Sequence, residues 1–214
     1  MLAVRVDQER TEALVALAPG TRQDGAFAEE FGQAVPEWLS LYTGLEAAAC
    51  RIRCFDPDVV DGLLQTEEYA RAVIEGNGQL SPEAVEQRVR FRMERQRRIF
   101  ETKKPANITF IMGEAALVSE VGSDDIMRAQ IERLRDTDRH RHVEVLVLPF
   151  TAGAYPRRGT FALLDFTDQE DPSVAYLDLP IGARYFDTEE DRAEYEYVYN
   201  AISALSIPLK EWKR

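Results

Sequence analysis

Val143-Glu144-Val145-Leu146-Val147-Leu148 is the stretch of this sequence that decides its fold. Its side chains are apolar on both alternating faces except at Glu144, a pattern that is typical of a strand covered on both sides. We therefore expect this strand to be central in a sheet. Two further strands are predicted at residues 160–166 and 174–179. The connections between these three strands are shorter than the dozen or so residues of a parallel crossover, so we expect an antiparallel meander.

The first half of the chain is dominated by helical spacing. Residues 36 to about 54 are predicted to form one helix, because apolar residues recur every three or four positions and Pro36 suits a first turn. Residues 81–100 form the clearest amphipathic pattern. Further helices are predicted at 66–74, 114–120, from 123 through 134, and around 195–205, with a strand at 107–112. The sequence thus predicts an α+β fold: a helical N-terminal half packed on an antiparallel meander in the C-terminal half, closed by a C-terminal helix.

The chain length, 214 residues, suits one domain with an appendage. Residues 1–35 are expected to hold a short helix at 11–18, ended by Pro19 and Gly20, and then a polar linker. Residues 36–214 are expected to form a single α+β domain.

The composition argues against several classes of function. The formal net charge is -12, so the overall field repels the phosphates of duplex DNA. The longest uncharged apolar run, 145–150, is far shorter than the ~20 residues of a membrane span, and no secretory signal is recognised, so we expect a cytoplasmic protein without a membrane partner. One exception to the acidity is the run of eight basic residues between Arg88 and Lys104. Its arginines either pair with the surplus acids or contact an anionic ligand or nucleic acid.

No metal site or cofactor is predicted. The acidic run that begins at Asp56 departs from a calcium loop at Val60, and His140 with His142 is interpreted as an exposed basic turn rather than as zinc ligands shared with the two cysteines. The sequence has no nucleophile elbow and no phosphate-binding glycine motif. Among the many carboxylates, Glu114 is the candidate for burial and acid–base chemistry, because it precedes an apolar turn.

Five motifs, taken in order, resemble one family. They are Trp38-Leu-Ser-Leu-Tyr-Thr-Gly-Leu45-Glu-Ala-Ala48, Val60-Asp-Gly-Leu-Leu-Gln65-Thr-Glu-Glu-Tyr69-Ala-Arg-Ala72, Glu86-Gln-Arg88-Val89 with Arg92, Arg95 and Gln96, Glu114-Ala-Ala-Leu117, and Val147-Leu-Pro-Phe150 with Gly153. From about residue 38 to its end, the chain resembles the C-terminal domain of antitoxin-like helix-turn-helix regulators of the XRE type in actinobacteria.

This resemblance implies a two-part protein, in which a helix-turn-helix reads DNA and the larger domain senses a ligand or a partner. The chain departs from the family at Asp61, where a proline is usual. The 35 residues before Pro36 are also too few for a DNA-reading module, which needs about 50 to 60. We therefore expect no direct DNA binding by this chain.

Two functions of different classes stay open, and the sequence favours the first. It is a regulatory domain, without its own DNA-binding module, that binds a small-molecule effector or a partner protein. We expect a largely apolar pocket or a homodimer face for it. The candidate residues are Gln65, Tyr69, Arg92, Gln96, Phe150 and Tyr155.

The alternative is a cofactor-free enzyme of the cyclase or isomerase type that acts on a natural-product intermediate on the same fold. Glu114 or Tyr69 would then be the catalytic acid or base.

Overall fold

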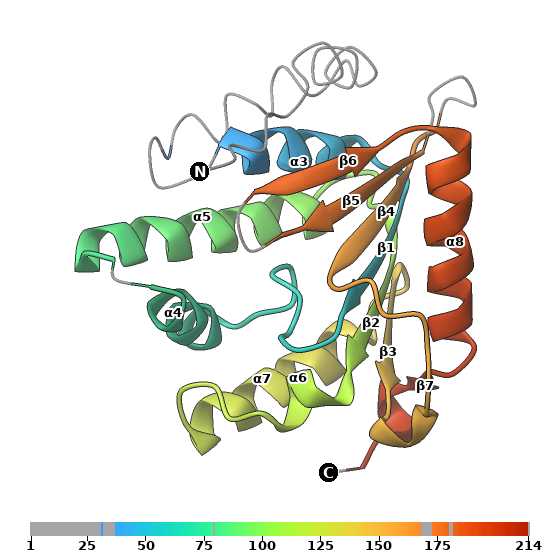
Figure 1. Ribbon diagram of the computed structural model, residues 1–214. Coiled ribbons are helices and arrows are strands. Elements are labelled where there is room, and N and C mark those ends of the chain that lie inside the picture. The colour runs from blue at the N-terminus through green and yellow to red at the C-terminus, as the bar shows by residue number, and fades with distance from the viewer. Residues whose placement is uncertain (1–30, 32–36, 79, 168–172, 180–181, 214) are drawn as a thin grey trace.

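The computed structural model describes residue 31 and residues 37–78, 80–167, 173–179 and 182–213. Seven strands in these residues form one mixed sheet in the order β6-β5-β4-β1-β2-β3-β7 (Figure 1). The first three strands pair in parallel, β4 to β6 continue antiparallel from β1, and β7 pairs antiparallel with β3. The strands are β1 (Arg51–Asp56), β2 (Asn107–Gly113), β3 (Val143–Leu148), β4 (Phe161–Asp165), β5 (Val174–Asp178), β6 (Ala183–Phe186) and β7 (Ile207–Pro208).

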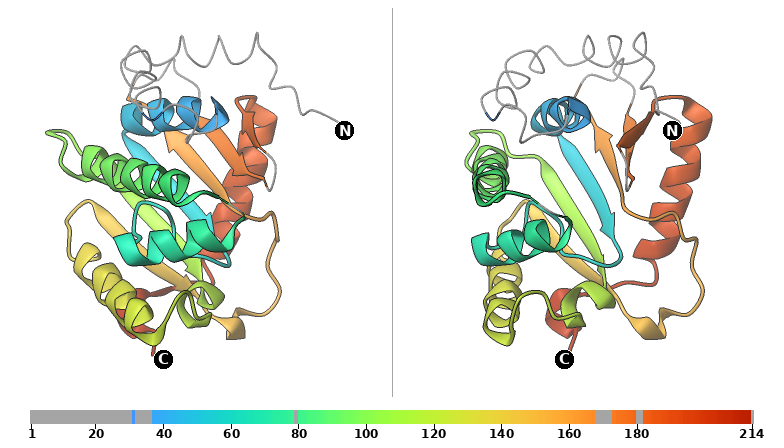
Figure 2. Two further views of the ribbon diagram at one scale, coloured as in Figure 1. Left: turned by 90° about the vertical axis from the view of Figure 1, so that its left-hand side faces the viewer. Right: turned by 60° about the vertical axis from the view of Figure 1, so that its left-hand side comes forward.

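Helices cover both faces of this sheet (Figure 2). On one face lie α3, α4, α5 and α7, and on the other lies α8. Two helix-containing crossovers make the parallel part of the sheet, because α4 and α5 connect β1 to β2, and α6 and α7 connect β2 to β3. The helix bounds are α3 (Glu37–Ala48), α4 (Glu67–Gly76), α5 (Pro82–Phe100), α6 (Glu114–Val118), α7 (Asp124–Thr137) and α8 (Glu189–Ser203), with short 3-10 turns at Phe150–Ala152 and Leu209–Glu211.

The alternation of strand side chains divides the core into two apolar layers. Ile52 and Cys54 of β1 contribute to the layer under α3, α4, α5 and α7, whereas Phe55 belongs to the layer under α8. The neighbouring β4 repeats the pattern, with Ala162 in the first layer and Phe161 in the second. Because both faces of the central strands are buried, register is fixed by packing on each side.

Short polar side chains begin four of the helices. In each case a hydroxyl oxygen accepts a hydrogen bond from the backbone N–H three residues further on, which satisfies one of the free donors of the first turn. These N-caps are Thr66 of α4, Ser81 of α5, Ser123 of α7 and Thr188 of α8. The helix starts expected at residues 66, 81 and 123 are thereby confirmed.

The predicted α+β class is confirmed, as are the helices expected to begin at residues 66, 81, 114 and 123 and the closing helix α8. The antiparallel meander is confirmed for β4 and β5, and β6 extends it. The helix expected at 11–18 lies outside the described residues. Across the described parts of the chain, no helix combines the length and apolar character needed to cross a bilayer.

Three expectations about the sheet are wrong. The helix predicted at 36–54 ends at residue 48, and residues 51–56 form β1, which is the middle strand of the sheet. The strand at 143–148 is next to the edge strand β7 rather than central. It also pairs in parallel with β2 and does not pair with β4, because β1 and β2 lie between these two strands.

Candidate functional site

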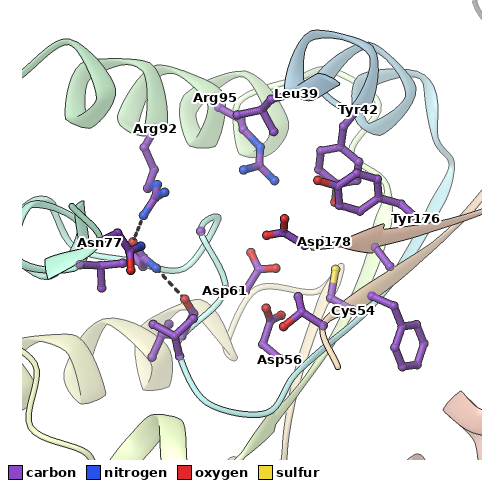
Figure 3. Close-up of a pocket in the computed structure, with 18 residues that line it drawn as sticks. Leu39, Tyr42, Cys54, Asp56, Asp61, Asn77, Arg92, Arg95, Tyr176 and Asp178 are labelled. Atoms are coloured by element: carbon purple, nitrogen blue, oxygen red, sulfur yellow. Dashed lines mark hydrogen bonds between the residues drawn. The ribbon is translucent and has the colours of Figure 1, made fainter. Parts of the chain in front are cut away.

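A cavity of about 220 Å³ lies at the carboxyl end of β1, on the face of the sheet that α5 covers. Side chains of β1, β4 and β5 form one wall, and side chains of α3 and α5 form the opposite wall (Figure 3). At β1 the sheet changes from parallel to antiparallel pairing. In sheets with parallel strands, ligands characteristically bind beyond the carboxyl ends of the strands, where the connections diverge.

Three carboxylates project into this cavity from the sheet side. Asp56 is the last residue of β1, Asp178 is the last residue of β5, and Asp61 lies in the loop between β1 and α4. Burial raises the pKa of Asp56 well above its ordinary value, and the charge and hydrogen bond of Asp61 raise it further. Burial also raises the pKa of Asp178, although Arg95 and Arg92 oppose that shift. The sheet side of the cavity therefore holds protons more tightly than free carboxylates do.

Arg95 of α5 forms a buried bidentate ion pair with Glu46 of α3. The Nε and Nη2 atoms of Arg95 each donate a 2.7 Å hydrogen bond to one carboxylate oxygen of Glu46, whose side chain is fully buried. The same guanidinium lies over the Tyr42 ring, 5.2 Å from its centroid. This pair locks α3 to α5 and neutralises Arg95 before any ligand enters.

Arg92, one turn earlier on α5, has no such carboxylate partner among the described residues. Its Nη1 atom donates a 2.5 Å hydrogen bond to Oε1 of Gln65 (Figure 3). Burial, followed by the like charge of Arg95, lowers the pKa of Arg92 to about 10. Arg92 nevertheless stays a cation at neutral pH, and it is a desolvated one that a ligand can pair with.

Two tyrosines and a thiol complete the polar lining. The rings of Tyr42 and Tyr176 are stacked, with centroids 4.1 Å apart and planes inclined by 32°. Cys54 of β1 is buried beside them, and burial raises the pKa of its thiol, so it is not an activated nucleophile. The aromatic pair adds to the apolar part of the lining, to which Leu39 and Val60 also belong.

The loop from residue 60 to residue 66 is held by the amide side chains of two helices. Gln96 of α5 donates to the carbonyl oxygens of Gly62 (2.8 Å) and Gln65 (2.9 Å). Gln130 of α7 donates to the carbonyl oxygen of Leu64 and accepts from the N–H of Thr66, both at 2.8 Å. These bonds satisfy buried backbone groups, so the loop is fixed before a ligand arrives.

A close backbone contact fixes the segment that follows β1. Gly113, at the end of β2, lies against Pro57, and a Cβ atom at position 113 would overlap the carbonyl oxygen of Pro57. Only glycine allows the chain to pass this closely. Asp56 is therefore positioned by the packing of β2 against the turn beside it.

The predicted ligand residues fall into three groups. Gln65 and Arg92 line the cavity. Tyr69 and Gln96 lie behind the 60–66 loop, where the Tyr69 hydroxyl accepts from the N–H of Val60 at 3.3 Å.

Phe150 and Tyr155 do not line this cavity. The Phe150 side chain is 67 % exposed, and Tyr155 packs edge-on against Phe55 in the layer under α8. The expectation of a largely apolar pocket is also wrong for this cavity, whose walls carry five charged side chains.

Glu114, the catalytic carboxylate suggested by the sequence, has both oxygens engaged elsewhere. One accepts from the N–H of Phe150 at 2.7 Å and the other from the indole N–H of Trp212 at 3.1 Å. In the described residues, no group of three or more histidines, cysteines or acids is arranged to hold a metal ion. His142 contacts Asn107 instead, with its Nδ1 atom 3.2 Å from the side-chain oxygen.

The comparisons with known proteins identify a family without assigning a function. The model of the family described as Domain of unknown function (DUF5753) matches residues 39–211, and the chain belongs to this family. The searches of curated proteins and of solved structures found no match.

Proposed function

We propose that this chain is a regulatory domain that binds a small polar molecule in the cavity at the carboxyl end of β1. The observation that supports this function best is the cavity itself, in which three carboxylates face two arginines within a preformed wall. Such convergent polar groups in a concave site are the usual mark of ligand recognition. In keeping with the resemblance of the sequence, the regulator would be of the XRE helix-turn-helix type.

A route for a regulatory signal leads from the cavity to Phe31. Leu39 of α3 lines the cavity and also packs in a small apolar cluster with Phe91 of α5 and Phe31. The rings of Phe31 and Phe91 meet edge to face, with centroids 5.4 Å apart. A ligand that changes the packing of Leu39 in the cavity would alter the contact between Phe31 and Phe91, and the bound state would be communicated to an effector module or a partner protein.

The pairing of the arginine-rich helix supports a function other than binding DNA. Arg95 is committed to Glu46, and Arg97 pairs on the surface with Glu94 and Glu101. We propose that this cytoplasmic domain makes no direct contact with DNA and that a partner protein or a second copy of the chain reads the state of the cavity.

Ligand-dependent thermal stability tests this function. The chain is melted against a library of polar metabolites, in parallel with Asp178→Asn and with the control Asp58→Asn, which removes the same charge from an exposed residue outside the cavity. A ligand at 100 times its Kd stabilises by about 2.7 kcal/mol, or about 5–10 °C for a chain of this size. We expect such a shift for the wild type and Asp58→Asn, and a smaller one for Asp178→Asn. If no compound produces a shift that depends on Asp178, the proposal is wrong.

A second candidate function, a cofactor-free enzyme, is favoured by the hydrogen-bonded carboxyl pair of Asp56 and Asp61. Two carboxyls that are hydrogen-bonded to each other can act as acid and base in one site. In that case Asp56→Asn and Asp61→Asn would each abolish turnover of the bound compound, while Glu114→Gln would leave the rate of turnover intact. Unchanged product formation in both aspartate variants, followed by mass spectrometry, would exclude this assignment.

A further inference from the structure

The two walls of the cavity carry opposite charges that are not balanced at contact distance. On the helix side, Arg92 is a desolvated guanidinium whose hydrogen-bond partner in the described residues is the neutral amide of Gln65. Its neighbour Arg95 does not share this state, because Glu46 neutralises it. A buried cation without a counter-ion is costly, and an anionic group that reaches it recovers part of that cost.

On the sheet side, the imbalance has the opposite sign. Asp61 and Asp56 are hydrogen-bonded to each other, and Asp178 adds a third carboxylate in the same cavity. In the described residues, no arginine or lysine forms an ion pair with any of these three. Figure 3 shows them grouped below the two guanidinium groups of α5. A cationic group placed among them would relieve their mutual repulsion.

The cavity size limits what can satisfy both walls at once. Its volume of about 220 Å³ lies below the roughly 300–1,000 Å³ of pockets that bind drug-sized ligands, so we expect a small ligand. A ligand of this size reaches both walls only if its two charged groups are close together. A phosphate is disfavoured as the anionic group, because its second negative charge would face three carboxylates across a small space.

We propose that the ligand of this cavity is a small amino-carboxylate zwitterion, whose carboxylate pairs with Arg92 and whose ammonium group lies among Asp61, Asp56 and Asp178. This inference rests on the proposed ligand-binding function and specifies the class of molecule. Arg92 is the residue that recognises the anion, and Asp61 is the residue that recognises the cation.

Four probes of equal chain length distinguish the possible charge patterns. They are 5-aminopentanoate, 1,5-diaminopentane, glutarate and 1,5-pentanediol, titrated into the full chain at neutral pH and followed by backbone amide NMR shifts. We expect 5-aminopentanoate to bind most tightly, with shifts at residues 60–66 and on α5. If the diamine, the diacid or the diol binds more tightly at these residues, the zwitterion inference is overturned, while the cavity remains a ligand site. If none of the four shifts these residues, the zwitterion inference is also overturned, and the metabolite library decides the proposed function independently.

Two substitutions assign the two ends of the ligand. Arg92→Gln should weaken 5-aminopentanoate by roughly 10- to 100-fold, the usual effect of losing a hydrogen bond to a charged group, and should not weaken the diamine. Asp61→Asn should weaken the zwitterion similarly but not glutarate, and its side-chain oxygen can still accept the 2.7 Å bond from Leu63 N–H. Arg90→Gln and Asp58→Asn, at exposed positions, are the matched controls. If either cavity variant lost the same affinity for all four probes, the assignment of the carboxylate end to Arg92 and of the ammonium end to Asp61 would be contradicted.

Discussion

Replacing Glu46 by Gln should destabilise the fold severely, because it removes the counter-ion of a buried arginine. Both oxygens of Glu46 accept 2.7 Å hydrogen bonds from Arg95, and the glutamate side chain has no exposed surface. A glutamine keeps one acceptor but turns an N–H donor toward the other Arg95 donor. Breaking a buried pair in this way typically costs about 3–5 kcal/mol, which is a large part of the ~5–15 kcal/mol by which a domain is stable.

Urea denaturation followed by circular dichroism measures this cost. Because urea is uncharged, it does not screen the ion pair as a guanidinium salt would. With a slope of about 2 kcal/mol per molar urea, the unfolding midpoint of Glu46→Gln should fall by about 1.5–2.5 M. The control is Glu94→Gln, which removes the same type of partner from the exposed Arg97 on the same helix. Its cost should stay below about 1 kcal/mol, as is usual for surface pairs.

The double variant Glu46→Met with Arg95→Met separates the pair from its surroundings. When both charges are replaced by apolar side chains, no uncompensated ion remains, so the double variant should lie within about 1 kcal/mol of the wild type. The reasoning is refuted if Glu46→Gln costs less than about 1 kcal/mol. It is also refuted if the losses of the two single Met variants simply add in the double variant, since the two residues would then not be coupled.

Three further outcomes follow from the same structure. The folded state raises the pKa of Asp56 and so holds a proton that the unfolded chain has already released. As the pH rises above the ordinary carboxyl range, the free energy of unfolding of the wild type should therefore fall by up to about 1.4 kcal/mol per pH unit. Urea titrations at a series of pH values should show this fall for the wild type and not for Asp56→Asn. Gly113→Ala should destabilise the fold by about 1–3 kcal/mol or more, because the added Cβ overlaps the turn after β1. The control Gly76→Ala, where nothing lies within 4 Å of the added Cβ, should leave the melting temperature nearly unchanged. Iodoacetamide should alkylate the exposed Cys50 in the native protein and reach the buried Cys54 only in denaturant. If peptide mass spectrometry shows that both cysteines of the native protein react at the same rate, the burial of Cys54 is wrong.

Local signals made the helices of this chain predictable from its sequence. Thr66 and Ser81 are capping residues followed by helix-forming sequence, and both positions are N-caps in the structure. Met127 and Leu134, which lie seven residues apart and so on one face of α7, are both fully buried. Such features depend on contacts within a few residues, so they do not require knowledge of the rest of the fold.

The central strand β1 was missed because its sequence continues the helical spacing of α3. Ile52 follows Leu45 and Ala48 at helical intervals, and Arg53 makes the segment look too polar for a central strand. The structure compensates for Arg53 through side chains that are distant in sequence: it donates to Asp165 and pairs with Glu196. Sequence patterns carry no signal for partners more than 100 residues away.

The candidate site was predictable only in part, for the same reason. Gln65 and Arg92 belong to motifs that the sequence itself displays, and both line the cavity. Asp178 was missed, because it meets the loop of Asp61 only through the strand order β5-β4-β1. That order depends on recognising β1, so one misassigned strand concealed the acidic wall of the site.

The fold separates charges that stabilise it from charges that remain available to a ligand. Arg95 and Arg53 are neutralised on opposite faces of the sheet by Glu46 and Asp165. The cavity differs from these pairs, because Arg92 and the three aspartates that line it form no ion pair among the described residues. Substitutions that neutralise the cavity should thus raise the stability of the free protein while they weaken binding, whereas substitutions in the neutralised pairs should only destabilise. A purely structural role for the cavity charges would instead make both kinds of substitution destabilising. The sign of the change in the free energy of unfolding therefore distinguishes a binding role of these charges from a structural one.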